Sequence, residues 1–557
     1  MKNKYKLIKT SDDIEINMLQ NRNLTKEEAN SLLNPTKKMV EDTSHYKNLN
    51  NGIDMYLKTI EEGGLIATLV DVDADGYLSS SIAYQFTVDE LRYENMVYII
   101  KDNKAHGLTD KLIDKLSESD VKLLIIPDAG SENYKLLKQV SELDISVLIL
   151  DHHIIEFTQE EQQSLHNIVI VNNQDGQVEN TYLSGTGVTY KFFKEVAKRK
   201  NIKLGNRYLD LVAVSLITDV CDMKMSYENR YYLLEGSKIS KHTNDLIKFF
   251  ATKLKKKKRD KFTITDFGFQ LGPKINSIIR YGTIEEKELL FNALIGCTDK
   301  VDGLTYQEMV YKVGDRYQRS QRSAVNKVIP QIQQIIETNN LDKYPVIFLD
   351  VTDVVDSNIR GLVCNKLIDK YKRPVMISNL KDGFYAGSSR GYEGKVDNFK
   401  DFCEQTNLFE YLKGHANAHG HKIKKENLPI FLEYCKNNLS IVNESQIEIE
   451  NIYKGEIPLE DLLCISEYEE LWCNQISIPK YLLTEVFITE KDIERTGNST
   501  YVIKLGEIAY IKEFGSLVRY QNILDAIEEN GGKLSVNILV EFRKGRKSYA
   551  KIIDIEW

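Results

Sequence analysis

The sequence predicts an α/β protein with a doubly wound parallel sheet, a long linking helix, a second α/β lobe and a C-terminal all-β module. Three patterns support this prediction. Short apolar runs alternate with helical stretches between residues 51 and 222, one amphipathic stretch spans 304–338, and period-two alternation dominates after 445. Alternating strands and helices are typical of parallel sheets with helices on both faces. A chain of 557 residues is also too long to fold around a single hydrophobic core, so several domains are expected.

The N-terminal residues 1–50 are expected to form a helical segment. Thr25-Lys-Glu-Glu has the form of a capping box, and Asn34-Pro35 would end the helix that it begins. Residues 51–300 are expected to form the first lobe. Its strands are predicted at 65–70, 96–100, 122–128, 146–151 and 168–171, and its helices at 77–93, 109–118, 131–142, from 185 onward, at 209–218 and in several segments of 226–300.

The rest of the chain divides into three predicted parts. Residues 301–340 form the linking helix, because apolar side chains recur on one face of that stretch. Residues 341–440 form the second lobe, with strands at 346–351 and 374–380 and a helix after each. Residues 441–557 form the all-β module, whose alternating segments are 501–505, 508–512, 537–544 and 551–557.

Composition indicates a cytoplasmic protein with a locally confined binding surface. The 74 basic and 82 acidic residues give a net charge of −8, so affinity for nucleic acid would have to come from a local groove. The basic run Lys253, Lys255–Lys258 and Arg259 is more often a solvated face than a phosphate contact. Seven cysteines without a CxxC pair fit a reducing compartment, and neither a secretory leader nor an 18-residue apolar run is present.

Carboxylates and imidazoles gather at the ends of three predicted strands. Asp71, Asp73 and Asp75 follow the first strand, and their alternation would send them to one side of an extended chain before Gly76 starts a helix. Asp128 ends a second strand, and Asp151-His152-His153 ends a third. Such strand ends are where open α/β sheets build their sites, and close carboxylates repel one another unless a cation lies among them.

Each motif taken alone has another interpretation, but none of these alternatives explains all the motifs together. A calcium loop of the EF-hand type would need Glu at the twelfth position, where this chain has Ile82. A single strand-end Asp is more often a helix cap, and an isolated pair of histidines is as often a surface feature as a site. Together the clusters predict a divalent-metal centre. Oxygen and imidazole ligands without thiolates favour Mn²⁺ or Mg²⁺ over structural zinc.

The order of these motifs resembles that of a known family. DVDADG (71–76), the Asp of IPDAG (128), DHH (151–153) and the Asp of SLITDVCD (219) are similar to the four motifs of the DHH phosphoesterase superfamily. The flanking sequence resembles the RecJ-type single-strand-specific exonucleases. The segments that carry this second resemblance are NLTKEEANSLLNP (23–35), SGTGVTYKF (184–192), ENRYYLLEG (228–236), LGPKINSIIRYG (271–282), GSSRG (387–391) and GHANAHG (414–420).

The resemblance implies two divalent cations, Mn²⁺ or Mg²⁺, and a role for each motif residue. The implied metal ligands are Asp128 as the bridge, Asp73 for the first ion, and Asp75, His152 and Asp219 for the second. The implied catalytic residues are His153, facing the scissile phosphate, Asp151, orienting its neighbours, and Asp71, which either completes the first metal's ligands or supports one of them.

The resemblance also implies phosphate contacts. Arg390, with Ser388 and Ser389, would lie in a Gly/Ser-rich turn that approaches the DNA backbone. The other implied nucleic-acid-binding residues are His415, Asn276, Arg280, and Lys101 and His106, which replace an Arg and a Tyr of the family. A second departure is DSNIRG (356–361) in place of HPGVIG, which makes Arg360 either a substitute anchor or a surface residue.

The resulting hypothesis is a monomeric 5′–3′ exonuclease that degrades single-stranded DNA to nucleoside 5′-monophosphates in repair or recombination. By its position in the chain, the C-terminal module resembles an oligonucleotide-binding (OB) barrel, and a single-strand-binding protein is an expected partner. A nano-RNase or cyclic-dinucleotide phosphodiesterase has only the two lobes. An inorganic pyrophosphatase would have His at position 71. A catalytically silent DNA-binding scaffold would have lost some of the ligands that are present here.

Overall fold

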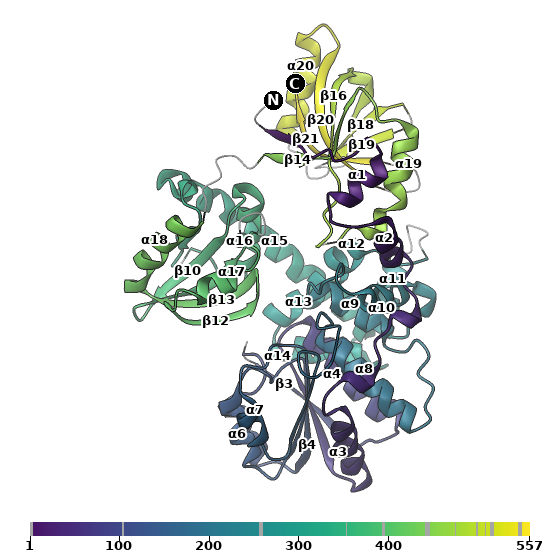
Figure 1. The fold of residues 1–557 in the computed structure, drawn as a ribbon, viewed down its shortest axis with the longest axis vertical. Helices are drawn as coiled ribbons and strands as arrows, with labels where there is room; N and C mark the ends of the chain where they lie inside the picture. Colours follow the sequence, from purple (N-terminus) through teal and green to yellow (C-terminus); the bar gives the residue numbers. More distant parts are fainter. Residues whose placement is uncertain are drawn as a thin grey trace. The chain divides into compact units, whose positions relative to one another are not determined.

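The computed structural model describes residues 4–102, 105–254, 260–352, 354–392, 396–439, 446–473, 475–496, 500–506, 508–512, 517–543 and 549–557. They form two compact units (Figure 1). Unit 1 contains residues 1–272, 287–308 and 446–557, and unit 2 contains 273–286 and 309–445. Within the described residues, no helix combines the length and apolar character needed to cross a membrane. The basic run at 255–259 lies outside the described residues.

A parallel sheet forms the centre of the first lobe, as the sequence predicts. Its strands are β2 (Leu65–Val70), β3 (Met96–Ile100), β4 (Val121–Pro127), β5 (Ser146–Asp151) and β6 (Ile168–Asn172). They pair in parallel in the order β3-β2-β4-β5-β6. The strands are nearly continuous apolar runs because both faces of the sheet are buried. In this order the chain reverses direction across the sheet between β2 and β4, which is where such sheets bind ligands.

Helices cover both faces of this sheet, so the fold is doubly wound (Figure 1). Apolar residues of α5 (Asp110–Ser117) and α6 (Tyr134–Ser141) pack on one face. The other face carries α3 (Leu49–Glu61), α4 (Ala74–Gln85) and α8 (Gly185–Arg199). A short helix, α7 (Gln159–Gln163), precedes β6.

A helical region follows the sheet. It contains α9 (Leu209–Thr218), α10 (Tyr227–Ser237), α11 (Asp245–Leu254), α12 (Ile264–Asp266), α13 (Gly272–Tyr281) and α14 (Ile284–Leu294). A small hairpin of β7 (Lys300–Val301) and β8 (Leu304–Thr305) leads into α15 (Tyr306–Thr338), a single helix of 33 residues. The predictions of α9 and of the long helix are confirmed.

Unit 2 contains a mixed sheet in the order β12-β13-β11-β10-β9. The elements are β9 (Ile347–Asp350), α16 (Arg360–Tyr371), β10 (Val375–Lys381), β11 (Phe384–Arg390), α17 (Phe399–Glu404), β12 (Phe409–His415), β13 (Ala418–Lys424) and α18 (Leu428–Asn438). The prediction of a helix after β10 is wrong, because Asp382 and Gly383 both adopt positive φ and form a tight turn into antiparallel β11.

The C-terminal segment differs from the predicted all-β module, because it contains α19 (Leu459–Glu467) and α20 (Leu517–Glu529). Its strands are β14 (Ile447–Ile449), β15 (Asn451–Lys454), β16 (Tyr481–Ile488), β17 (Ile493–Arg495), β18 (Tyr501–Leu505), β19 (Ile508–Lys512), β20 (Leu534–Arg543) and β21 (Tyr549–Glu556). The main sheet is mixed, in the order β15-β16-β20-β21-β19-β18-β17. Among its described strands no pairing joins β15 to β17, so the expected closed barrel is not formed there.

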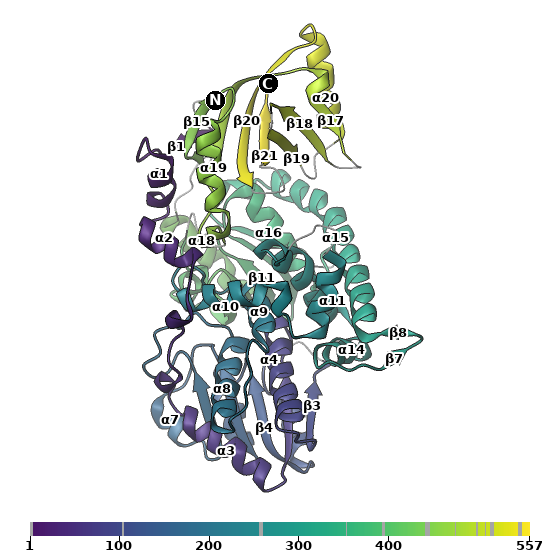
Figure 2. The ribbon, with the colours of Figure 1, turned by 90° about the vertical axis from the view of Figure 1, so that its right-hand side faces the viewer.

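The N-terminal elements belong to the same core as this C-terminal sheet (Figures 1 and 2). They are β1 (Tyr5–Leu7), α1 (Ile14–Gln20) and α2 (Lys26–Leu33), and the capping box of Thr25 and Glu28 is confirmed. Strand β1 pairs in parallel with β14. Met18, Leu19 and Leu32 are buried among apolar side chains of α19, β16 and β20. These N- and C-terminal elements are called the terminal module below.

Candidate metal centre and phosphate-binding residues

The carboxyl ends of β2, β4 and β5 bring the predicted metal ligands together. Asp71 follows β2, Asp128 follows β4, and Asp151 is the last residue of β5. The sheet order places β2 directly beside β4 and β4 beside β5. Neighbouring parallel strands end at the same edge of a sheet, so the three motifs converge although they are far apart in sequence.

The segment from Asp71 to Gly76 is not extended, which corrects the expected alternation of its carboxylates. Asp73 is the N-cap of α4 and accepts a hydrogen bond from the Gly76 amide at 3.0 Å, so Asp75 lies in the first helical turn. A Cβ on Gly76 would lie 2.5 Å from the Asp71 Cβ. Only glycine therefore allows α4 to begin this close to the end of β2.

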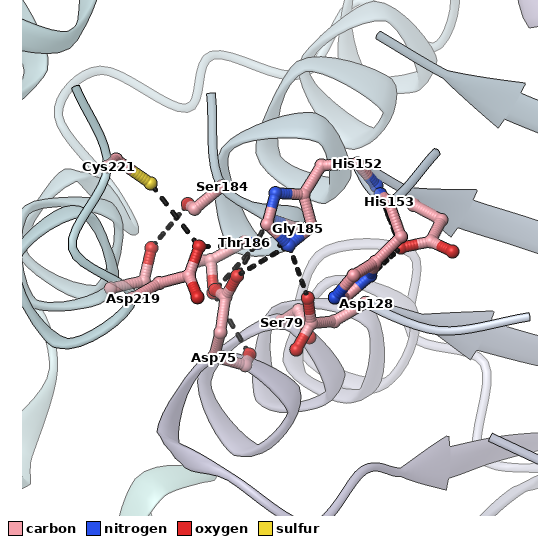
Figure 3. Close-up of polar contacts among 12 residues, drawn as sticks. Asp75, Ser79, Asp128, His152, His153, Ser184, Gly185, Thr186, Asp219 and Cys221 are labelled. Carbon is pink, nitrogen blue, oxygen red and sulfur yellow. Dashed lines mark hydrogen bonds and ion pairs between the residues drawn. The ribbon is translucent and has the colours of Figure 1, made fainter. Parts of the chain in front are cut away.

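The Asp75 carboxylate is buried against the N-terminus of α8 (Figure 3). It accepts hydrogen bonds from the Gly185 amide at 2.8 Å, the Thr186 amide at 2.9 Å and the Thr186 hydroxyl. Burial, followed by the charge of Asp219, raises the pKa of Asp75 to about 7. The protein therefore holds Asp75 firmly in a position where its negative charge is unfavourable without a cation.

The surroundings of Asp128 favour a cation beside its carboxylate more strongly than those of the other candidate ligands. It is buried, and it adopts a φ of 62°, a backbone conformation that non-glycine residues rarely take. Burial and the nearby carboxylates, with Asp75 first among them, raise the pKa of Asp128 well above its usual value. Its Oδ1 atom lies 3.2 Å from His152 Nε2 but has no hydrogen-bond donor among the described residues. A divalent cation at this atom would satisfy it.

His152 contacts three carboxylates that come from different elements (Figure 3). Its Nε2 atom lies 3.2 Å from Asp128 Oδ1, 3.7 Å from Asp219 Oδ2 and 3.9 Å from Asp75 Oδ2. Asp219 is delivered by the C-terminus of α9, and the Cys221 thiol donates to its Oδ2 at 3.4 Å. The structure thus brings together the residues that were expected to hold the second ion and the bridge.

Asp151 orients both histidines. It is fully buried, and its Oδ1 accepts from the His152 amide at 2.7 Å and contacts His153 Nδ1 at 2.8 Å. Its Oδ2 accepts from the Ser131 amide at 3.0 Å. Burial alone would lower the pKa of His153, but the charge and hydrogen bond of Asp151 raise it to about 10. Asp151 therefore favours the protonated form of His153.

The surroundings of Asp71 change the expected role of Lys101. The Lys101 ammonium is buried and donates to Asp71 Oδ1 at 2.9 Å and to the carbonyls of Ala105 and Gly107 at 2.5 and 2.7 Å. All three of its donors are used inside the protein, so it does not face DNA as expected. His106 is exposed, and its Nδ1 lies 2.6 Å from Asp71 Oδ2. Although burial opposes the change, His106 and Lys101 lower the pKa of Asp71 to about 2.

Among the residues that the structure describes, three groups of side chains could each hold a metal ion, with their ligand atoms within 4.8 Å of one another. They are Asp71-Asp73-His106, Asp75-His152-Asp219 and Asp128-Asp151-His152-His153. These carboxylates and imidazoles suit Mn²⁺ or Mg²⁺. Sequence reasoning assigned His106 to DNA and missed it as a ligand candidate. Its position shortly after β3 was the available signal.

In unit 2, Arg360 is the first residue of α16, and the Arg390 guanidinium lies beside Gly361 in the same helical turn. Arg390 ends β11, and its guanidinium would be 2.7 Å from a Cβ placed on Gly361. It donates to Asn365 Oδ1 at 3.1 Å and to the Ser389 carbonyl at 2.8 Å. Burial lowers the pKa of both arginines, and the charge of Arg280 lowers that of Arg390 further.

Neither arginine forms a direct ion pair with a carboxylate in the described part of unit 2, although the charge of Asp356 acts on Arg360 from a greater distance. The ion pairs there join other groups, such as Lys274 and Arg319 with Asp315. The Nε atom of Arg360 is buried without a hydrogen-bond partner among the described residues. Partly buried guanidinium groups that are not in a direct ion pair suit a phosphate, which accepts hydrogen bonds from such donors in pairs.

The GSSRG segment is part of β11 and not the expected turn, which changes the role of Ser389. The Ser389 hydroxyl is buried and contacts His421 Nδ1 at 2.7 Å, while Ser378 contacts His421 Nε2 at 2.6 Å. Burial, with the charges of His419 and Arg360, lowers the pKa of His421 to about 3, so it is neutral. The Ser389 hydroxyl therefore faces His421 in the interior instead of a phosphate. Sequence reasoning did not identify His421.

The remaining predicted DNA contacts are less constrained. Ser388 and Asn276 are half-buried, and Arg280 is exposed in the last turn of α13. The side chain of His415 lies outside the described part of the structure. These residues stay predictions.

Comparisons with known proteins agree with the geometry of the centre. Residues 65–216 match the DHH family, N-terminal domain. The YorK protein of the SPbeta prophage in Bacillus subtilis (strain 168), named for a single-strand DNA-specific exonuclease, is 30% identical over 98% of this chain and 96% of its own length. The single-stranded-DNA-specific exonuclease RecJ of the same organism is 24% identical over 70% of this chain and 47% of its own.

Solved structures show the same fold. RecJ of Thermus thermophilus in complex with Mn²⁺ has a TM-score of 0.70 at 16% identity, covering 98% of this chain and 76% of that one. The Mg²⁺ complex of that protein has a TM-score of 0.61 at 15% identity, covering 98% of this chain and 74% of that one. Because YorK is 30% identical to this chain over nearly the whole length of both, the chain belongs to the DHH family and, within it, to the RecJ- and YorK-like proteins.

Proposed function

We propose that this protein is a metal-dependent exonuclease that degrades single-stranded DNA from the 5′ end and releases nucleoside 5′-monophosphates. The observation that carries the proposal is the buried carboxylate group at Asp75, Asp128 and Asp219 around His152. Its raised pKa values and the unsatisfied Asp128 oxygen fit a site built for divalent cations. Family membership selects DNA hydrolysis among the reactions that such a site supports.

Asp128 is the proposed bridging ligand, because it lies beside His152 and its carboxylate faces the other acids. We assign Asp73 to the first ion, and Asp75, His152 and Asp219 to the second. When bound, two Mn²⁺ or Mg²⁺ ions would supply an activated water and neutralise charge on the attacked phosphate. Asp71 completes the first site together with His106, or fixes that imidazole from behind through the 2.6 Å contact.

His153 is the proposed electrostatic partner of the scissile phosphate. Asp151 fixes its Nδ1 side, so that the ring is held in one orientation. The raised pKa favours the protonated imidazole. A fixed cation that is in place before the reaction stabilises negative charge developing on the phosphate at little reorganisation cost.

In unit 2, Arg390 and Arg360 are the proposed phosphate grips, with Arg280, Asn276, Ser388 and His415 as further contacts. Neither guanidinium group forms a direct ion pair with a carboxylate of the described residues, so both can attract a phosphate of the strand. Arg360 then compensates for Lys101, whose ammonium is occupied by Asp71. We further propose a monomer that acts in DNA repair or recombination in a reducing, cytoplasmic setting, consistent with its seven free cysteines.

The proposal is tested with 5′- and 3′-labelled single strands, matched duplexes and dinucleotides, each with Mn²⁺, Mg²⁺ or EDTA. The expected result is metal-dependent release of labelled mononucleotide from 5′-labelled single strands at the earliest times. Early release from the 3′ label would contradict the polarity. Preference for dinucleotides over longer strands would favour a nano-RNase. No cleavage with either metal would favour a silent DNA-binding scaffold.

A further inference from the structure

The loop that follows Asp219 is held by a segment from the far end of the chain. This loop, residues 220–225, connects α9 to α10. The Gln475 side chain contacts it twice: Oε1 accepts from the Met223 amide at 3.2 Å, and Nε2 donates to the Val220 carbonyl at 3.4 Å. One amide therefore bonds to the loop at both ends of a four-residue stretch that begins directly after Asp219.

The segment that carries Gln475, here the clamp segment (residues 469–473, 475 and 476), is firmly anchored in the terminal module. Leu471, Trp472 and Ile476 are buried in the core that the N- and C-terminal elements share. Cys473 and Ile476 exchange backbone hydrogen bonds of 3.0 and 3.2 Å, which places Gln475 in a tight turn. A side chain on such a support can act as a fixed reference point for the loop that it contacts.

Arg230 ties the same two segments together. Its side chain is fully buried; Nε donates to the Met223 carbonyl at 2.8 Å, and the guanidinium donates to the carbonyls of Glu470 at 2.9 Å and Leu471 at 2.6 Å. Met223 is thus held through its amide by Gln475 and through its carbonyl by Arg230. Arg230 also donates to Cys473 Sγ at 3.4 Å. Because the groups of the loop that are held are backbone amides and carbonyls, the contacts fix the path of the loop.

The loop needs such support because its first residue is strained. Val220 adopts a φ of 58° and closes the C-terminus of α9, where the Cys221 amide donates to the Leu216 carbonyl at 3.0 Å. Glycine usually occupies this position, and a β-branched residue there costs about 1–2 kcal/mol. Surrounding contacts must stabilise this conformation, and it sets the direction in which the preceding Asp219 points.

We propose that Gln475 is a positioning residue for the metal centre: by holding the loop 220–223, the terminal module fixes Asp219 and sets the metal affinity of the group Asp75-His152-Asp219. This inference rests on the proposed role of Asp219 as a ligand. It gives the terminal module a role in positioning Asp219, in addition to any contact with DNA. Reciprocally, metal binding at this group stabilises the docking of the clamp segment, since coupling between two sites acts in both directions.

The experiment measures Mn²⁺ binding to the full-length protein by calorimetry for wild type, Gln475→Ala, Asp219→Asn and the double variant. Gln521→Ala is the matched control, because that glutamine is exposed on α20 and, among the described residues, its side chain bonds to Asp525 of the same helix. Gln475→Ala is expected to weaken one of two Mn²⁺ sites by about tenfold, the lower end of the range for loss of a residue that orients a ligand, because Gln475 acts on Asp219 only through the loop. When Asp219→Asn is already present, adding Gln475→Ala should change the Mn²⁺ affinity less than twofold, because both substitutions act through the Asp219 carboxylate.

Two further readouts separate positioning from general support. Hydrogen exchange of the amides in 220–225 and in the clamp segment should slow when Mn²⁺ is added to wild type, and should not respond to Mn²⁺ in Gln475→Ala. The kcat on a trinucleotide should fall at fixed Mn²⁺ and recover at saturating Mn²⁺, while KM stays within twofold. A lowered melting temperature with unchanged Mn²⁺ affinity would make Gln475 merely structural and overturn the inference.

The outcomes distinguish this inference from the proposed function. If Asp219→Asn weakens Mn²⁺ binding while Gln475→Ala and Gln521→Ala both bind as wild type, only the positioning role fails. If Asp219→Asn itself binds two ions with wild-type affinity, the ligand assignment fails and the inference falls with it. Equal losses from Gln475→Ala in both backgrounds also overturn it, because the effect would then bypass Asp219.

Discussion

Adding one methyl group at Gly185 should disable the metal centre while leaving every candidate ligand in the sequence. Gly185 is the first residue of α8, and its amide holds Asp75 at 2.8 Å. A Cβ at this position would lie 2.7 Å from the Asp128 Cβ and 2.8 Å from its Cα. The substitution Gly185→Ala therefore pushes on two proposed ligands at once, and neither obstructing atom can be moved by rotating a side chain.

The size of the effect follows from these distances. Ordinary van der Waals contact begins at 3.4 Å, so the methyl must move Asp128 or α8 by about 0.7 Å. Overpacking of this kind costs roughly 1–3 kcal/mol of stability. A misplacement approaching 1 Å in a catalytic site can cost about 100-fold in rate. We expect kcat on a single-stranded oligonucleotide to fall by about 100-fold, and Mn²⁺ affinity measured by calorimetry to fall by at least tenfold.

Gly268→Ala is the matched control, because its methyl would meet only Ile217 Cγ2 at 3.6 Å, an ordinary contact. It should retain wild-type rate and Mn²⁺ binding. A folded Gly185→Ala protein with wild-type Mn²⁺ affinity and more than half of the wild-type rate would refute the reasoning. The close approach of α8 to Asp128 would then not be what positions the ligands.

Four more outcomes are expected. Asp128→Ala should abolish hydrolysis while the protein remains folded; more than about a tenth of wild-type rate, equivalent to ~1.4 kcal/mol, would contradict the bridging role. His153→Ala should lower turnover yet bind two Mn²⁺ ions, whereas His152→Ala should lose one by calorimetry; loss of an ion from the first variant would make His153 a ligand. Arg390→Ala should weaken oligonucleotide binding and reduce the salt slope by about one unit without changing Mn²⁺ occupancy, and an unchanged slope would remove it from the DNA contacts. Val220→Gly should raise the melting temperature of the metal-free protein. The substitution relieves about 1–2 kcal/mol of backbone strain, which exceeds the roughly 0.5–1 kcal/mol that the greater entropy of the unfolded chain costs. A lower melting temperature would show that the valine side chain is needed for packing.

The sequence predicts the catalytic sheet and most of its site for a physical reason. Each strand of a sheet buried on both faces is a continuous apolar run, and each functional side chain follows directly on such a run. The motifs at Asp71, Asp128 and Asp151 can therefore be recognised in the sequence, and the sheet order brings them together. The apolar helix that ends at Thr218 is equally clear, and it delivers Asp219.

Features that depend on tertiary partners could not be predicted in this way. The pattern of Asp71, Asp73 and Asp75 fits an extended strand, but capping by Asp73 starts α4 earlier. Lys101 looks like a free cation in sequence, and only the structure shows that Asp71 and two carbonyls occupy it. The alternating C-terminal runs predict strands correctly but not their mixed order or the intervening helices. Strand order depends on pairing between residues far apart in the chain.

The joining of the two ends of the chain has a consequence for how the protein is made. Lys4 pairs with Asp554 at 2.6 Å, and β1 pairs with β14, so these N-terminal residues leave the ribosome well before their partners. At 5–20 residues per second, the 550 residues between the two partners take roughly 30–110 s to synthesise. The catalytic sheet is complete long before that. During this interval the apolar residues of α1 and α2 lack the C-terminal partners that bury them in the folded protein.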